Sequence, residues 1–227
     1  AIIIFIGCEQ NNYIGAVVTG HPEATKIGIQ VLKDGGNAID AAIAVQIALA
    51  VCLPNAGNIG GGGFMIYRTH NGKTHALDFR EVAPQSAHRD MYLDESGEVI
   101  PNMSLYTTHA AGVPGTVAGF GYAHDKYGTK SWNYLLRPAI KLASNGFELS
   151  FRDALYLNAS RSFFLRDDEA AKIFAAQENY TVGDLFIQRD LGKTLRRISL
   201  GGPEEFYTGV TANMIQDCMD RTGGIIE

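Results

Sequence analysis

The sequence predicts an α+β fold whose second half is mostly helical. Two apolar runs, 64–69 and 73–79, flank an Asn-Gly pair, which is a strong β-hairpin signal. The segment 38–52, AIDAAIAVQIALAVC, has the length of a helix and only two polar residues. From residue 111 onward the pattern is mainly that of helices separated by proline and glycine.

The first predicted elements are one strand and two helices. Residues 14–20, IGAVVTG, are β-branched and bounded by glycine, which predicts a strand. A helix follows from Pro22 and ends at the glycine pair before Asn37. Asn37 is a candidate cap for the next helix, over 38–52. Because that helix is apolar on nearly every face, it must be buried between layers.

The remaining elements follow from proline, glycine and capping signals. Proline favours the first helical turn, so Pro114 and Pro138 are expected to open helices. Ser150 and Asp153 have the spacing of a capping box. A short extended segment is predicted over 181–188, with helices after it.

Charge and composition argue against several classes of function. The 227 residues carry 19 basic and 24 acidic side chains, with no basic stripe, so we do not expect a nucleic-acid partner. The cysteines, Cys8, Cys52 and Cys218, form no CxxC pair, and the six histidines form no HExxH motif. We therefore expect neither a disulfide scaffold nor a metal site.

Residues 1–13 form a separate unit in the predicted organisation, ahead of one domain portion over 14–227. The start, AIIIFIGC, is either an apolar arm or the remnant of a lipoprotein signal whose Cys8 would carry the lipid. No segment reaches the ~20 apolar residues that span a bilayer.

The glycine-rich run GNIGGGGFM, residues 57–65, lacks the context of a nucleotide site. A phosphate-binding loop needs GxxxxGK[ST] before a helix, and a dinucleotide site needs a strand before its glycines and a helix after them. Here a helix precedes and a strand follows. The run is therefore a place where the backbone passes something closely or adopts positive φ.

Arg80 lies at the end of the second hairpin strand, with Asp78 and Glu81 beside it in the sequence. Its guanidinium is either paired with a neighbouring carboxylate or available to hold the carboxylate of a ligand in a two-pronged contact. The spacing alone leaves both roles open.

Four motifs carry a family resemblance: GHPEAT…VLKDGGNAIDAAIAV, GNIGGGGFM, ALDFREVAP and AAGVPGTVAGF. From about Val18 to Glu227 the chain resembles the N-terminal part of the γ-glutamyltranspeptidases, above all the bacterial ones. The resemblance implies part of an N-terminal-nucleophile hydrolase with an αββα four-layer sandwich.

The resemblance also implies a mechanism and a site. Such a precursor cuts itself into two subunits, and the new N-terminal Thr of the small subunit attacks the γ-glutamyl amide of glutathione. The glutamyl group then passes to water or to an amino acid or peptide, and no cofactor takes part. By its DFRE motif, Arg80 would bind the α-carboxylate of the glutamyl group. Gly60, Gly61, Gly62 and Gly63 would be structural residues near the site.

The nucleophile is expected downstream of Glu227, in the small catalytic subunit that would be the partner of this chain. The sequence YTTH does contain Thr107, Thr108 and His109, but it precedes the GVPGT motif and is interpreted as a loop. The chain would thus contribute no catalytic residue, only Arg80, and would be inactive alone.

The family resemblance further implies a periplasmic or secreted protein, bound to a membrane only if Cys8 is lipidated. Two other functions stay open. The chain could belong to a non-catalytic binding or scaffold module, or to a relative that acts on another amide, such as a cephalosporin acylase.

Overall fold

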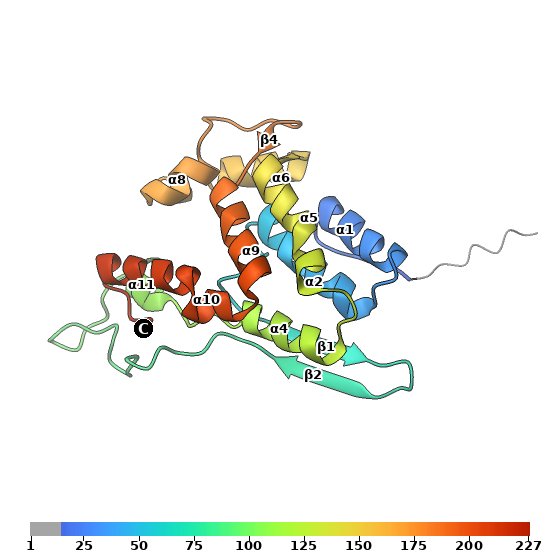
Figure 1. Ribbon diagram of the computed structural model, residues 1–227. Coiled ribbons are helices and arrows are strands. Elements are labelled where there is room, and N and C mark those ends of the chain that lie inside the picture. Colours follow the sequence, from blue (N-terminus) through green and yellow to red (C-terminus); the bar gives the residue numbers. More distant parts are fainter. Residues whose placement is uncertain (1–14) are drawn as a thin grey trace, which may run out of the picture.

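The computed structural model describes residues 15–227 (Figure 1). The predicted arm over 1–13 and Cys8 lie outside the described residues. The longer helices are α1 (Pro22–Lys33), α2 (Ala38–Cys52), α4 (Thr116–Tyr127), α5 (Trp132–Asn145), α6 (Phe151–Ala159), α9 (Arg189–Gly201) and α11 (Val210–Thr222). The shorter ones are α3 (Met103–Tyr106), η1 (Thr108–Ala110), α7 (Arg161–Phe164), α8 (Asp168–Phe174) and α10 (Glu204–Thr208).

The strands form two antiparallel pairs. They are β1 (Phe64–Arg68) with β2 (Thr74–Asp78), and β3 (Phe147–Glu148) with β4 (Leu185–Phe186). The predicted hairpin is confirmed, and Gly72 in its turn has a φ of 87°, a conformation that favours glycine. The short extended segment before α9 is confirmed as β4.

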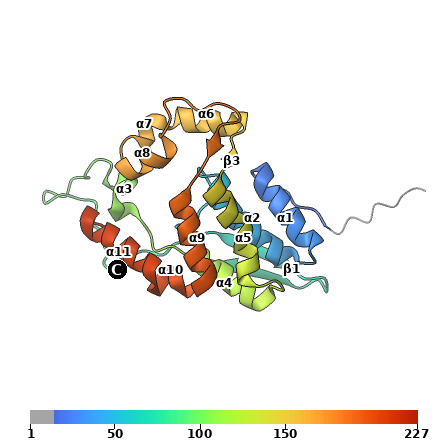
Figure 2. The same cartoon turned by 45° about the horizontal axis from the view of Figure 1, so that its top comes forward.

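The apolar helix α2 is the centre of the core. Twelve of its fifteen residues are buried, and it packs against α1, α4 and α5. Helix α5 in turn packs against α9, so that α1, α2, α5 and α9 lie side by side (Figure 2). The prediction that this helix is enclosed between layers is confirmed. Only the stripe Ala38, Ala42 and Gln46 stays exposed.

The start of α2 is fixed by a network around Asp40, whose side chain is fully buried. Asn37 caps the helix as predicted, and its backbone N–H donates to the Asp40 carboxylate at 2.9 Å. That carboxylate also accepts from the backbone N–H groups of Thr129 and Lys130, at 2.9 and 3.1 Å, and from the Thr129 hydroxyl. Burial alone would raise the pKa of Asp40, but these hydrogen bonds outweigh it and the pKa is lowered.

Two predicted elements differ from the structure. Residues 15–20 form no strand, because no strand of the described chain runs beside them to pair with. Pro138 lies inside α5 rather than opening it, since Ser131 caps the helix about two turns earlier. The buried face of α5, which includes Leu135 and Ala139, carries the helix through the proline.

Candidate active site

Arg80 lies two residues after the end of β2. The hairpin of β1 and β2 lies on the side of the molecule opposite α6 (Figures 1 and 2). Phe79 extends the hairpin by one more pair, since its N–H donates to the Gly63 carbonyl at 3.0 Å and its carbonyl accepts from Gly63. The Arg80 N–H donates to the Asp78 carboxylate at 3.0 Å. The backbone around Arg80 is therefore held on both sides.

The glycine run lets the chain pass very close to the backbone of Phe79 and Arg80. A Cβ on Gly62 would lie 2.6 Å from the Phe79 carbonyl oxygen and 2.7 Å from the Arg80 Cα, so only glycine fits there. Gly115, in the AAGVPGTVAGF motif, approaches the same group: a Cβ on it would lie 2.1 Å from the Phe79 carbonyl oxygen. We call this arrangement the glycine clamp: Gly62 and Gly115 enclosing the Phe79–Arg80 backbone.

The other glycines of the run differ from one another. A Cβ on Gly63 would lie 3.0 Å from the Phe79 ring, and one on Gly61 would lie 2.8 Å from Asn58. Around Gly60 no heavy atom of the described residues lies within 4 Å of such a Cβ. All glycines from 57 to 63 lie within the described chain, and none has positive φ. Close approach, and not an unusual backbone conformation, therefore accounts for Gly61, Gly62 and Gly63, whereas neither accounts for Gly60.

Asn58 ties the glycine run to α4, a role that the sequence analysis missed. Its side-chain oxygen accepts from the Gly61 N–H at 2.9 Å and from the Thr116 hydroxyl at 2.6 Å. The Gly61 carbonyl accepts from the N–H groups of Gly115 and Thr116, at 2.8 and 3.0 Å. The spacing from Asn58 to Gly61 is that of a local Asn turn, which is the one signal in the sequence for this contact.

The Arg80 side chain is 66% exposed, and its guanidinium lies 5.9 Å from the centre of the Phe64 ring. The nearest carboxylate is Glu81, 3.7 Å from the Arg80 Nε, which is too far for a hydrogen bond. Asp78 is engaged with the backbone instead. Within residues 15–227 the guanidinium therefore keeps all its donors available for a carboxylate ligand.

Arg80 lies on the wall of a groove of about 410 Å³. Glu81, Met91, Tyr92 and His109 also line it. The Tyr92 hydroxyl donates to the His109 carbonyl at 3.2 Å, which joins two parts of the segment that leads from the hairpin to α4. Neither Tyr92 nor His109 was predicted as a site residue.

The described side chains offer no activated nucleophile. Thr108 begins the short η1 turn, and Thr107 directly precedes it. The Thr107 hydroxyl donates to the Met103 carbonyl and the Thr108 hydroxyl to the Thr222 carbonyl, so neither donates to a base. Burial raises the pKa of the Cys52 thiol to about 12, so it stays protonated and unreactive. Cys218 is a free thiol that is partly exposed.

Residues 15–227 contain neither a metal-binding cluster nor a membrane-spanning helix. No three His, Cys, Asp or Glu side chains there are grouped so that they could hold a metal ion. No helix there combines the length and the apolar character needed to cross a membrane.

A sequence model of the family described as Gamma-glutamyltranspeptidase matches residues 24–227. The chain belongs to the gamma-glutamyltranspeptidase family. It is 46% identical to the glutathione hydrolase proenzyme of Escherichia coli over 214 residues, which is 93% of this chain and 37% of that protein. It is 42% identical to the Bacillus subtilis (strain 168) proenzyme over 221 residues, 92% of this chain and 36% of that protein.

Solved structures give the same result. The fold matches Helicobacter pylori gamma-glutamyltranspeptidase with a TM-score of 0.91 and 48% identity, over 96% of this chain and 63% of that one. It also matches the cephalosporin acylase of Bacillus halodurans with a TM-score of 0.80 and 27% identity, over 98% and 44% of the two chains. The predicted fold class is confirmed: the chain forms part of the N-terminal-nucleophile hydrolase fold of this family. It spans little more than a third of the length of its curated relatives.

Proposed function

We propose that this chain is the N-terminal portion of the large subunit of a γ-glutamyl transferase or hydrolase that acts on glutathione and other γ-glutamyl amides. The nucleophilic Thr would lie in the small subunit of the same precursor. The names of the relatives, glutathione hydrolase proenzymes, support both the substrate and the precursor.

The observation that carries the proposal is the position of Arg80. The glycine clamp fixes its backbone, while its guanidinium lies at an open groove with no hydrogen bond to a described residue. A permanently charged planar fork held in this way suits a small ligand with a free carboxylate. In the proposed role, Arg80 holds the α-carboxylate of the glutamyl group and so orients the γ-amide toward the nucleophile.

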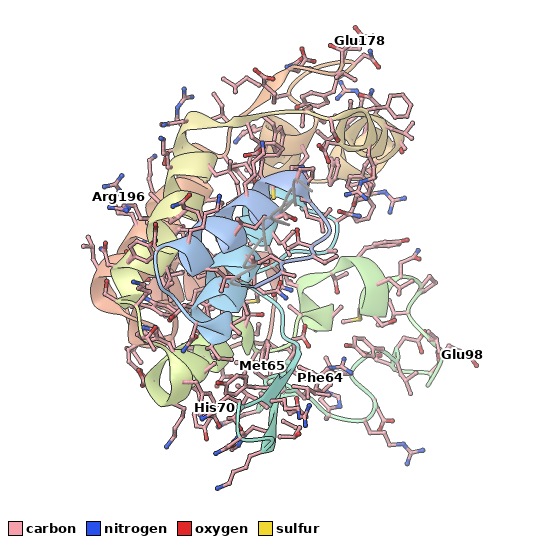
Figure 3. The ribbon with its side chains drawn as sticks, turned by 90° about the vertical axis from the view of Figure 1, so that its right-hand side faces the viewer. Phe64, Met65, His70, Glu98, Glu178 and Arg196 are labelled. Atoms are coloured by element: carbon pink, nitrogen blue, oxygen red, sulfur yellow. The ribbon has the colours of Figure 1, made fainter. Side chains whose placement is uncertain are left out.

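The outer face of the hairpin supports a partner that completes the site. Phe64 and Ile66 are 66% and 79% exposed, and the cross-strand neighbour of Ile66 is the small Ala76. Figure 3 labels Phe64 and its neighbour Met65 on this strand. An apolar sheet face of this kind is costly in water, so we propose that strands of the remaining precursor cover it.

The test is to replace Arg80 in the complete gene product. In the Arg80→Ala variant, self-cleavage into two subunits should proceed normally while KM for glutathione rises strongly. Loss of a charge-assisted contact of this kind is worth about 2–4 kcal/mol in kcat/KM. The Arg80→Lys variant should recover little, because lysine lacks the planar fork.

Two results would contradict the proposal. If Arg80→Ala blocks folding while any mature fraction keeps normal kinetics, Arg80 has a structural role and does not bind the substrate. A complete gene product that matures and yet hydrolyses no γ-glutamyl amide would favour the alternative of a non-catalytic module.

We also propose that the protein works outside the cytoplasm, in the periplasm or secreted, with a membrane anchor only if Cys8 is lipidated. The family resemblance and the apolar residues before Cys8 support this. Cell fractionation of a strain carrying the native gene tests it, and an entirely cytoplasmic pool would refute it.

A further inference from the structure

A second cavity, of about 280 Å³, lies at the end of the molecule away from the hairpin. Its floor is apolar and comes from Phe147, Leu149, Leu157 and Phe186, which pack between α6 and the β3–β4 pair. It shares no lining residue with the Arg80 groove. Helix α6 and the hairpin lie at opposite sides in both views (Figures 1 and 2). This cavity is therefore a separate site.

The largely buried side chain of Asp153 lines this cavity. The Asp153 side chain is only 10% exposed, and its Oδ2 accepts from the Ser150 N–H at 2.9 Å, from the Ser150 hydroxyl at 2.6 Å and from His21 Nε2 at 3.2 Å. Its other oxygen, Oδ1, has no hydrogen-bond partner within residues 15–227. These hydrogen bonds outweigh the effect of burial and lower the pKa of Asp153, so the group is ionised at neutral pH.

The Arg152 side chain lines the same cavity as Asp153 but forms no ion pair with it. Arg152, the preceding residue of α6, lines the same cavity, and its guanidinium donates to the Gly20 carbonyl. No ion pair within residues 15–227 joins Arg152 to Asp153 or to any other acid. The cavity thus presents a negative group and a positive group, each with bonding capacity left, above an apolar floor.

We propose that this cavity binds an α-amino acid with an apolar side chain. The ammonium group of the ligand would donate to Asp153 Oδ1, its carboxylate would accept from the Arg152 guanidinium, and its side chain would pack on Phe147 and Phe186. The volume is close to the lower end of the range for ligand pockets, ~300 Å³, which suits one amino acid better than a peptide.

The charges exclude simpler ligands. A carboxylic acid without an amine would meet the unpaired oxygen of Asp153 and be repelled, and an amine without a carboxylate would leave Arg152 unused. The Cys52 thiol at the cavity wall is protonated and adds no charge. A zwitterion satisfies both groups at once.

The test uses L-phenylalanine as the probe and the complete gene product as the protein. Binding is measured by saturation-transfer NMR and calorimetry, and compared with phenethylamine and 3-phenylpropanoate, which each lack one charged group. We expect each analogue to bind roughly tenfold or more weakly, the loss typical of one hydrogen bond to a charged group. Equal binding of all three molecules would overturn the proposal.

Variants assign the binding to this cavity. Arg152→Gln should weaken L-phenylalanine binding roughly tenfold or more. The matched control is Arg196→Gln, since Arg196 is exposed on α9 and projects from the edge of the molecule (Figure 3). Its substitution should leave binding unchanged. Binding should also persist in an Arg80→Ala background, which separates the cavity from the groove.

Three results would contradict the proposal. Binding that Arg152→Gln leaves intact, or that Arg80→Ala abolishes, would locate the amino acid elsewhere. Absence of binding at millimolar concentration would mean that the cavity takes no free amino acid, for example because another segment of the longer protein fills it. The kinetic test of Arg80 is independent of all three results, so the two proposals can fail separately.

Discussion

The helical core and the hairpin region differ in whether their polar groups are hydrogen-bonded and their apolar groups are covered. In the core, the buried Asp40 carboxylate has four hydrogen bonds, and α2 is covered on almost every side. At the hairpin, the Arg80 guanidinium has no hydrogen bond within residues 15–227, and Phe64 and Ile66 face outward. In the core, polar groups are hydrogen-bonded and apolar groups are covered within the chain itself. In the hairpin region, a charged group and an apolar face remain that suit a ligand and a partner.

This difference indicates where substitutions should change stability and where they should change function. Groups that are satisfied within the chain contribute to folding, and their loss leaves buried donors without acceptors. Groups without partners contribute little to folding and are available for binding. The glycine clamp belongs to both classes, because it is part of the packing and also fixes the backbone of Arg80.

The largest effect on stability is expected at Asp40. In an Asp40→Ala variant, the backbone N–H groups of Asn37, Thr129 and Lys130 lose the buried carboxylate that accepts from them, at a cost of about 3 kcal/mol. The matched control is Asp125→Ala, whose side chain is 84% exposed and whose loss should cost under about 0.5 kcal/mol. Thermal unfolding of both variants of the complete protein measures this. Equal midpoints would show that the Asp40 network is not what stabilises the core.

The glycine clamp is expected to give the next largest effect. Gly62→Val places a branched side chain where a Cβ would already lie 2.6 Å from the Phe79 oxygen, so the strand end must move and folding or maturation should suffer by roughly 1–3 kcal/mol. Gly60→Val is the control, because nothing described lies near its Cβ. The soluble and self-cleaved fractions report the difference. A Gly62→Val enzyme that matures normally and loses only substrate affinity would contradict the role of close packing.

Acid should act on the core through Asp40, with a smaller effect. Because its folded-state pKa is lowered, its contribution to stability is complete above the unfolded-state pKa, ~3.9, and is lost as the pH falls through the folded-state value. Unfolding followed from neutral to acid pH should therefore show a smaller loss of stability in an Asp40→Asn variant than in the natural chain. Parallel pH curves for the two proteins would count against this role of Asp40.

Local signals in the sequence predicted most of the core. The cap at Asn37, the capping box of Ser150 and Asp153, and the turn at Gly72 each depend on residues a few positions apart, and all are present. The enclosure of α2 followed from its composition alone. The strand predicted over 14–20 is wrong for residues 15–20, because a strand needs a neighbouring strand and the local sequence pattern cannot supply one.

The candidate site was predicted only in part. The sequence drew attention to Arg80 and the glycine run, and the resemblance gave Arg80 its role. The second half of the clamp, Gly115, and the contact between His21 and Asp153 join residues far apart in the chain. Spacing within one sequence contains no signal for such contacts. The role of Arg80 toward a substrate stays a prediction.

That role can be tested most directly by changing the enzyme and the donor together. In the complete protein, kcat/KM is measured for a γ-glutamyl anilide and for the 4-aminobutyryl anilide, which lacks the α-carboxylate. The natural enzyme should prefer the first donor by roughly 30- to 1000-fold, the equivalent of about 2–4 kcal/mol, and Arg80→Ala should reduce this preference to near one. If Arg80→Ala lowers kcat/KM equally for both donors, Arg80 does not bind the α-carboxylate, and the central claim is wrong.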